Sequence, residues 1–174
     1  MANKDRIAGM DQKNMAAIYE AHANTMPADQ VYRELIKNSL ESCARMKKRD
    51  PNFKGQILIC ESPNHPGKIS VIDNGEGIPK STIVPLVSDL AATHEQSKDG
   101  NFGHGTKVSA FANNQEGILY HSYYADDDEG SAVKIYKNSS GKYAAKYFEE
   151  YGSCRIPLDL ESLPDIIRES GHGN

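Results

Sequence analysis

The stretch VIDNGEGIP, residues 71–79, carries an aspartate and two glycines directly after a hydrophobic run. The run has the composition of a β-strand, so we expect it to deliver Asp73 into the turn that follows. Glycine adopts backbone conformations with positive φ and lets a ligand come close to the main chain. A plain Asp-Asn-Gly turn would explain Gly75 without a ligand, but it explains Gly77 and the Ile-Pro after it less well.

A second strand-like run lies just upstream of this stretch. Residues 56–61 and 68–73 are both rich in strand-forming side chains, and SPNHPG at 62–67 separates them. Proline, asparagine and glycine in such a cluster are typical of a turn between strands. The two runs therefore predict a β-hairpin that ends at Asp73.

A long helix is predicted before the hairpin. Residues 29–49 contain no Gly or Pro, Asp29 can cap the start, and Pro51 cannot continue the helix. Apolar residues recur at helical spacing and form one broad stripe, which we expect to be the buried face: Val31, Tyr32, Leu35, Ile36, Leu40, Cys43 and Met46.

Polar residues follow one edge of that stripe at positions i, i+4, i+7 and i+11: Glu34, Asn38, Glu41 and Arg45. Residues at this spacing stack in a single row along the helix. Such a row can line a pocket. An ordinary solvated helix face is the alternative, and for this helix taken alone it is the more common one.

The stretch GNFGHGTKVSA, residues 100–110, places glycines immediately before a predicted helix start. Backbone N–H groups are unpaired there and the helix dipole is positive, so an anion such as a phosphate binds readily, and Lys107 adds a full charge. The signal is weak by itself. It lacks the Gly-Lys-Ser/Thr ending of a Walker loop, and no strand immediately precedes it as in a Rossmann fingerprint.

The remaining chain predicts helices and a group of strands. Helical patterns cover residues 11–24, 78–90 and 106–112, with a polar loop at 91–103, and four strands are predicted at 117–124, 131–137, 142–149 and 153–160. Strands that are grouped rather than alternating with helices favour an α+β fold, in which helices cover one face of a mainly antiparallel mixed sheet in a two-layer sandwich.

The domain prediction divides the chain at residue 160. Residues 1–160 are expected to form one domain, and residues 161–174 a tail that could begin the next domain. A helix could begin in the tail, but we expect it to have nothing to pack on.

The composition sets further limits on function. The chain has 174 residues, of which 25% are charged and 38% hydrophobic, and a net charge of −4. This balance predicts a folded, soluble domain and argues against a generally basic nucleic-acid surface. A local basic patch at Arg45, Lys47, Lys48 and Arg49 could still meet phosphates, although a solvated helix end is the commoner explanation.

The cysteines Cys43, Cys60 and Cys154 lie far apart, which fits neither a disulfide framework nor paired zinc ligands. No apolar run approaches the roughly 20 residues that cross a bilayer, and the N-terminus carries no apolar signal region. We therefore expect a cytoplasmic protein. The histidines have no close His or Cys partner at metal-ligand spacing, so no metal other than magnesium is predicted.

The order and spacing of these stretches resemble the GHKL superfamily of DNA gyrase, heat-shock chaperones, histidine kinases and MutL, whose ATP-binding domains share the Bergerat fold. ELIKNS at 34–39 looks like the N box of that family, and DNGEGI at 73–78 like its Asp-x-Gly-x-Gly box. GHGTK at 103–107 looks like its second glycine box, and GSCRIPL at 152–158 is similar to the Gly-Thr that enters a late strand. The resemblance covers roughly residues 10–160.

The resemblance implies an ATP site with Mg²⁺. Asp73 would accept a hydrogen bond from the adenine amino group, with Gly75, Gly77 and Ile78 around the base. A buried carboxylate that is unpaired without ligand rewards a base with an exocyclic donor and rejects a carbonyl, so ATP should bind better than GTP. Ser153 would stand where the family usually has threonine, near the adenine. Because it keeps the hydroxyl, this replacement should have little effect.

The same resemblance assigns the phosphate end of the site. Asn38 would bind Mg²⁺, with Glu41 behind it, and Glu34 would be the general base that activates water at the γ-phosphate. The β- and γ-phosphates would be received by the second glycine box, with residues 91–102 as a lid: Gly103, His104, Gly105, Thr106 and Lys107.

The expected function is Mg-dependent ATP binding and slow hydrolysis, which drives lid closure in a larger protein or a dimer. The run from Phe102 to Phe111 looks nearer to the chaperone, MutL and MORC branches than to kinases. Those branches use a following domain and dimerise on ATP, so weak activity is expected of this chain alone. Two alternatives stay open: a nucleotide-dependent switch without significant hydrolysis, and an interaction or nucleic-acid scaffold with vestigial boxes.

Overall fold

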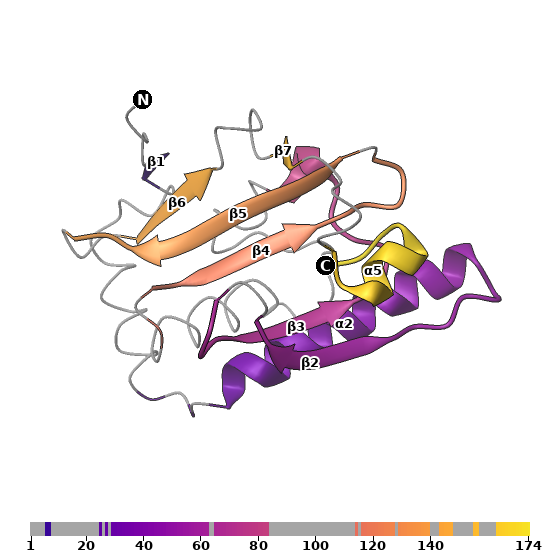
Figure 1. Cartoon of the computed structure of the whole chain (residues 1–174), viewed down its shortest axis with the longest axis horizontal. Coiled ribbons are helices and arrows are strands. Elements are labelled where there is room, and N and C mark those ends of the chain that lie inside the picture. The colour runs from indigo at the N-terminus through magenta and orange to yellow at the C-terminus, as the bar shows by residue number, and fades with distance from the viewer. Residues whose placement is uncertain are drawn as a thin grey trace.

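The computed structural model describes residues 6–7, 25, 27, 29–62, 65–83, 114, 116–127, 129–139, 143–147, 155–156 and 163–174. Within these ranges the elements follow the order β1-α2-β2-β3-β4-β5-β6-β7-α5 (Figure 1). The predicted helices at 11–24 and 106–112 and the loop at 91–103 lie outside the described residues, while residues 80–83 are helical where the 78–90 helix was predicted.

Helix α2 (Gln30–Arg49) confirms the long predicted helix almost to the residue. Asp29 is its N-cap, but it acts through its backbone: its carbonyl accepts from the N–H groups of Tyr32 and Arg33 at 3.1 and 3.3 Å. Its side chain makes no capping hydrogen bond. The helix ends at the extended Asp50, directly before Pro51.

The buried face of α2 differs from the predicted apolar stripe. Its buried residues are Ser39 and Ser42, whereas the side chain of Leu40, within the stripe, is 57% exposed. The reason is close packing: the turn after Asp73 lies against the helix backbone, and only small side chains leave room for it. Leu40 and Tyr32, which is 38% exposed, were therefore wrongly predicted to be buried.

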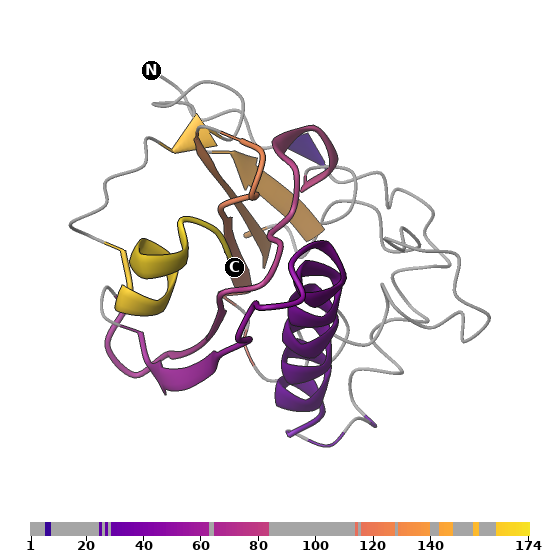
Figure 2. The same cartoon turned by 90° about the vertical axis from the view of Figure 1, so that its right-hand side faces the viewer.

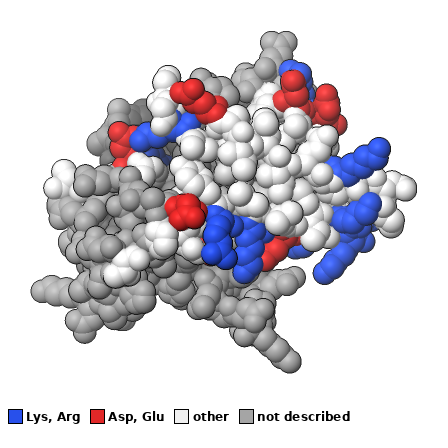
Figure 3. Space-filling view, turned by 90° about the horizontal axis from the view of Figure 1, so that it is seen from below, with Lys and Arg blue, Asp and Glu red and all other residues white. Residues whose placement is uncertain are grey.

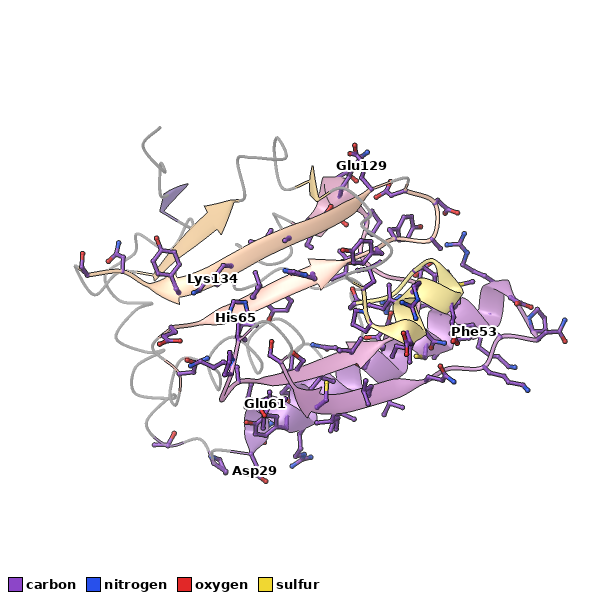
Figure 4. All side chains as sticks on the ribbon, viewed as in Figure 1. Asp29, Phe53, Glu61, His65, Glu129 and Lys134 are labelled. Atoms are coloured by element: carbon purple, nitrogen blue, oxygen red, sulfur yellow. The ribbon has the colours of Figure 1, made fainter. Side chains whose placement is uncertain are left out.

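The hairpin is confirmed. Strands β2 (Ile57–Glu61) and β3 (Ile69–Asp73) pair antiparallel, with Ile57 opposite Asp73. In the connection, the backbone N–H of Gly67 donates to the carboxylate of Glu61 at 2.7 Å, and Figure 4 labels Glu61 at this strand end. The hairpin delivers Asp73 to the edge of α2.

The second sheet contains strands from both ends of the chain. Its path is β1-β6-β5-β4, and its members are β1 (Arg6–Ile7), β4 (Ile118–Ser122), β5 (Gly130–Lys137) and β6 (Tyr143–Tyr147). Strand β7 (Arg155–Ile156) pairs with the start of β5 instead of extending the sheet beyond β6. The first three of the four predicted strands therefore pair in chain order, and the fourth pairs with β5 and not with β6.

The C-terminal segment joins the two sheets. Gly173 and Tyr123 exchange backbone hydrogen bonds at 2.7 and 2.8 Å, and Asn174 and Asp73 do the same at 2.9 and 3.0 Å. Such reciprocal pairs are the unit of an antiparallel ladder. Residues 173–174 thus lie between β3 and β4 and connect the hairpin to the larger sheet.

Helix α5 (Asp165–Ser170) packs on the core, together with Leu163, which lies two residues before it. Leu163 and Ile167 form one buried cluster with Ile72 of β3 and Tyr123. The prediction that this segment has nothing to pack on is wrong, because its apolar side chains could be matched to a partner only in three dimensions. The division of the chain at residue 160 stays a prediction.

The two helices lie on opposite sides of β3. Side chains alternate along a strand, and accordingly Ile72 contacts the α5 side while Asp73 contacts α2. Figure 2 shows α2 and α5 on either side of the strands, with the C-terminus between them. The chain has the α+β architecture predicted from its sequence. Among the described residues, no helix has both the length and the apolar character needed to cross a bilayer.

Candidate functional site

Asp73 is the most deeply buried ionisable group beside α2, with 2% of its surface exposed. Its Oδ1 accepts the backbone N–H of Gly75 at 2.9 Å and the side-chain N–H of Asn174 at 3.3 Å. The hydroxyls of Ser39 and Ser42 also hydrogen-bond to it. Burial raises the pKa of Asp73 because desolvation outweighs these four donors, which lower it.

The glycines of the Asp73 turn are required by its packing. A Cβ on Gly75 would lie 2.3 Å from Ser42 Oγ and 2.6 Å from the backbone nitrogen of Cys43. Gly77 has φ +77°, and a Cβ there would lie 2.3 Å from the carbonyl oxygen of Tyr123. The turn is therefore held between α2 and the end of β4. Packing alone requires glycine at both positions, whether or not a ligand binds.

Asn74 ties the same turn to the start of the hairpin. Its Oδ1 accepts the N–H of Gln56 at 2.7 Å, and its amide nitrogen donates to the carbonyl of Lys54 at 3.1 Å. Burial and the charge of Asp73 raise the pKa of Cys43 to about 11. The thiol therefore stays protonated and donates weakly to Asn74 Oδ1 at 3.9 Å.

Glu76 links the turn to the last turns of α2 through charges. Arg45 Nε and Arg49 Nη1 donate to its two carboxylate oxygens at 3.0 and 3.1 Å, and the Glu76 side chain is 14% exposed. Arg49 also pairs with Asp126 at 2.7 Å. These pairs extend from α2 to the connection between β4 and β5.

The basic end of α2 is largely used within the fold. Figure 3 shows the Lys and Arg side chains of one face of the molecule in several separate groups, most of them beside acidic side chains. Arg45 and Arg49 are ion-paired, and Lys47 Nζ donates to the carbonyl of Phe53 at 2.8 Å. A structural role thus accounts for three of the four residues of the predicted phosphate-meeting patch.

The predicted polar row lies at the edge of the buried face. Glu34, Asn38, Glu41 and Arg45 are all half-buried. Gln30 Nε2 donates to Glu34 Oε1 at 2.8 Å, which fixes the direction of that carboxylate. Asn38 offers an amide oxygen, and Glu34 and Glu41 offer carboxylate oxygens; these are the hard ligands that Mg²⁺ prefers. Within the described ranges, there is no group of three or more His, Cys, Asp or Glu residues that could hold a metal ion.

The structure thus brings together two of the three predicted stretches. Asp73 contacts Ser39, the residue directly after Asn38, so the aspartate turn packs against α2. Whether these residues form one binding site stays a prediction. Ile78 continues the turn away from the helix, with its N–H donating to Ser122 Oγ at 2.6 Å. The other predicted site residues lie outside the described residues: Gly103, His104, Gly105, Thr106, Lys107 and Ser153.

Three residues around Asp73 were missed by the sequence analysis: Ser39, Ser42 and Asn174. The serines carry a signal that could have been used, because two small hydroxyl residues at i and i+3 beside an N-box-like asparagine are suited to a close, polar contact. Asn174 carries no such signal in the sequence. It reaches Asp73 through sheet pairing between positions 101 residues apart.

The sequence was compared with known proteins. No curated protein matches it. A family model described as histidine kinase-, DNA gyrase B- and HSP90-like ATPase matches residues 25–153, well over half of the chain. The matched range contains α2, the hairpin and the Asp73 turn, which form the geometry described above. The chain therefore belongs to the GHKL superfamily of histidine kinase-, DNA gyrase B- and HSP90-like ATPases, with an ATP-binding domain of that type.

Proposed function

We propose that this domain binds ATP with Mg²⁺ between α2 and the Asp73 turn, and hydrolyses it slowly. The observation that carries the proposal is the buried Asp73 carboxylate, held against the helix whose edge bears Glu34 and Asn38. A carboxylate whose pKa is raised by burial is destabilising for the fold alone. A ligand that donates hydrogen bonds to the Asp73 carboxylate would explain why a charged group is buried there.

Adenine recognition follows from the chemistry of Asp73. A carboxylate accepts hydrogen bonds, so it matches the exocyclic amine of adenine and opposes the carbonyl that guanine carries at that position. The hydroxyls of Ser39 and Ser42 can rotate, so each can donate either to Asp73 or to a base nitrogen. ATP is expected to bind better than GTP for this reason.

The half-buried row on α2 would face the phosphates. Asn38 would hold Mg²⁺ through its amide oxygen, with Glu41 behind it. When bound, the ion neutralises phosphate charge that would repel an attacking water. Glu34 would orient that water and take its proton as the water oxygen bonds to the γ-phosphorus and the bond to the β–γ bridging oxygen breaks. Gln30 holds Glu34 in a defined direction for this role.

The remaining parts of the mechanism rest on the family resemblance. The predicted second glycine box, residues 103–107, would receive the β- and γ-phosphates, and residues 91–102 would close as a lid. Ser153 would stand near the adenine. We further propose a cytoplasmic protein of the chaperone, MutL and MORC type, which dimerises on ATP and works with a downstream domain, so that this chain alone turns over slowly.

A nucleotide-dependent switch without significant hydrolysis is the second candidate. A third reading, a scaffold with vestigial boxes, predicts no stabilisation by ATP. A working pocket at 100 times its Kd would be stabilised by about 2.7 kcal/mol. A thermal melt with and without Mg-ATP therefore separates the scaffold from the other two.

Replacing Glu34 by Gln tests the enzymatic role. The substitution keeps the shape and the contact with Gln30 but removes the base, so we expect phosphate release to fall about 100-fold or more while ATP affinity changes by less than about threefold. The matched control is Glu61→Gln, an exposed carboxylate on β2. Equal turnover in wild type and Glu34→Gln would exclude Glu34 as the base, and no turnover in either would favour the switch.

A further inference from the structure

Asn174 is fixed beside Asp73 by both its backbone and its side chain. The two residues exchange backbone hydrogen bonds at 2.9 and 3.0 Å. The side-chain amide nitrogen donates to Asp73 Oδ1 at 3.3 Å and to Ser42 Oγ at 3.1 Å. The carboxamide therefore lies against the same carboxylate that we assign to adenine recognition.

The other end of this carboxamide lacks a partner. Asn174 Oδ1 is buried and accepts no hydrogen bond anywhere in the part of the chain that the structure describes. Exchanging the oxygen and nitrogen would not relieve this, because the oxygen would then face the Asp73 carboxylate, which also only accepts. A buried acceptor without a donor is destabilising, and native proteins rarely keep one without a function.

The segment that carries Asn174 is held firmly. His172 Nδ1 lies 2.7 Å from the carbonyl oxygen of Gly75, and since a carbonyl only accepts, this nitrogen carries the proton. The ring of Phe53, labelled in Figure 4, packs against the His172 ring with centroids 6.0 Å apart. These contacts keep Asn174 from turning its oxygen toward solvent.

We propose that Asn174 determines base specificity together with Asp73, by accepting the second N–H of the exocyclic amine of adenine through Oδ1. This inference rests on the proposed ATP site. An exocyclic amine has two hydrogens, and the Asp73 carboxylate and Asn174 Oδ1 are two buried acceptors side by side. A base with a carbonyl at that position would place an acceptor against both of these acceptors, so two acceptors discriminate more strongly than Asp73 alone.

The test compares ATP with purine riboside triphosphate, which lacks only the amine, in calorimetric titrations with Mg²⁺. In wild type, loss of the amine removes both hydrogen bonds. In Asn174→Leu it removes only the bond to Asp73. We expect the ratio of the two Kd values, analogue over ATP, to be about five- to tenfold smaller in Asn174→Leu than in wild type. Glu169→Ala, at an exposed position of the same C-terminal segment, should leave the ratio unchanged.

The outcomes separate this inference from the proposed function. ATP binding with the same ratio in wild type and Asn174→Leu would overturn the role of Asn174 and leave the ATP site standing; an ordered water on Oδ1 would give that result. No ATP binding by folded wild type would overturn both. If Asn174→Leu does not fold, as judged by circular dichroism, Asn174→Ala serves with the same expectation.

Discussion

Asp73 shows how stability and function oppose each other at a single residue. It is buried at the end of β3, and desolvation raises its pKa although four donors surround it. A raised pKa in the folded state means that the folded chain binds this proton more tightly than the unfolded chain. The stability that the tighter binding of this proton contributes is therefore fully present below the ordinary carboxyl pKa of 3.8. It is lost as the pH rises through the raised pKa of Asp73.

Asp73→Asn should make the chain more stable at pH 7 in the absence of nucleotide, because the amide carries no charge to desolvate. The advantage over wild type should shrink as the pH falls and disappear below about pH 4, where the wild-type carboxyl is protonated. Urea unfolding of both proteins between pH 4 and pH 8 measures it. A variant that is less stable than wild type at pH 7 would show that the hydrogen bonds of Asp73 outweigh its desolvation.

Gly75 offers a second test at the residue scale. Gly75→Ala would place a Cβ 2.3 Å from Ser42 Oγ and 2.5 Å from the Ser42 carbonyl carbon, so helix and turn would have to move apart. We expect a loss of about 3 kcal/mol or more in the free energy of unfolding. Gly67→Ala is the control: φ is +78° but nothing lies within 4 Å, so it should lose only about 1 kcal/mol. Equal losses in urea unfolding would contradict the close packing of α2 on the turn.

At the scale of elements, the contact between α2 and the Asp73 turn depends on Glu76. Its carboxylate has two guanidinium partners and is 14% exposed, whereas Asp126 in the same network is 60% exposed. A half-buried charge that loses its partners is more destabilising than an exposed one. The turn should therefore be held in place mainly by Glu76 and Arg45.

Glu76→Gln is expected to lower the free energy of unfolding by about 1–2 kcal/mol, and to weaken ATP binding because Asp73 lies three residues upstream on the same turn. Asp126→Asn should change neither the free energy of unfolding nor ATP binding. Identical unfolding curves for Glu76→Gln and wild type would show that the pair is only a surface contact.

The elements that the sequence predicted well are those fixed by local chemistry. Helix α2 is bounded by Asp29 and Pro51, and the hairpin by a turn rich in proline and glycine, so both were found. The exposure of Leu40 and the pairing of β7 with β5 depend on which element lies opposite, and no local pattern encodes that. The burial of Leu40 was therefore predicted wrongly, and the pairing partner of β7 was not predicted.

At the scale of the whole molecule, the C-terminal segment completes the fold. Residues 173–174 connect the two sheets, and α5 covers the side of β3 opposite α2. Ile167→Ala should lose about 3 kcal/mol in the free energy of unfolding, because its side chain is buried against Ile72. The exposed neighbour Glu169→Ala should lose almost nothing. A similar midpoint for both variants in urea would contradict the packing of α5 on the core.

The site could be predicted from the sequence only where its residues belong to recognisable stretches. Asp73 and the half-buried row on α2 were identified in advance, and the structure packs the Asp73 turn against α2, while their roles in a binding site stay predictions. Ser39 and Ser42 were overlooked because an apolar stripe was taken to mark the buried face. Asn174 was overlooked because only the assembled sheet brings it to Asp73.

The most direct test of the ATP site is calorimetric titration of the folded chain with Mg-ATP, repeated with Asp73→Asn. We expect one ATP to bind per chain and GTP to bind more weakly. Asp73→Asn should stay folded and lose ATP affinity by about 100-fold or more. No heat of binding with folded wild type, or equal affinity in the two proteins, would contradict an ATP site at Asp73.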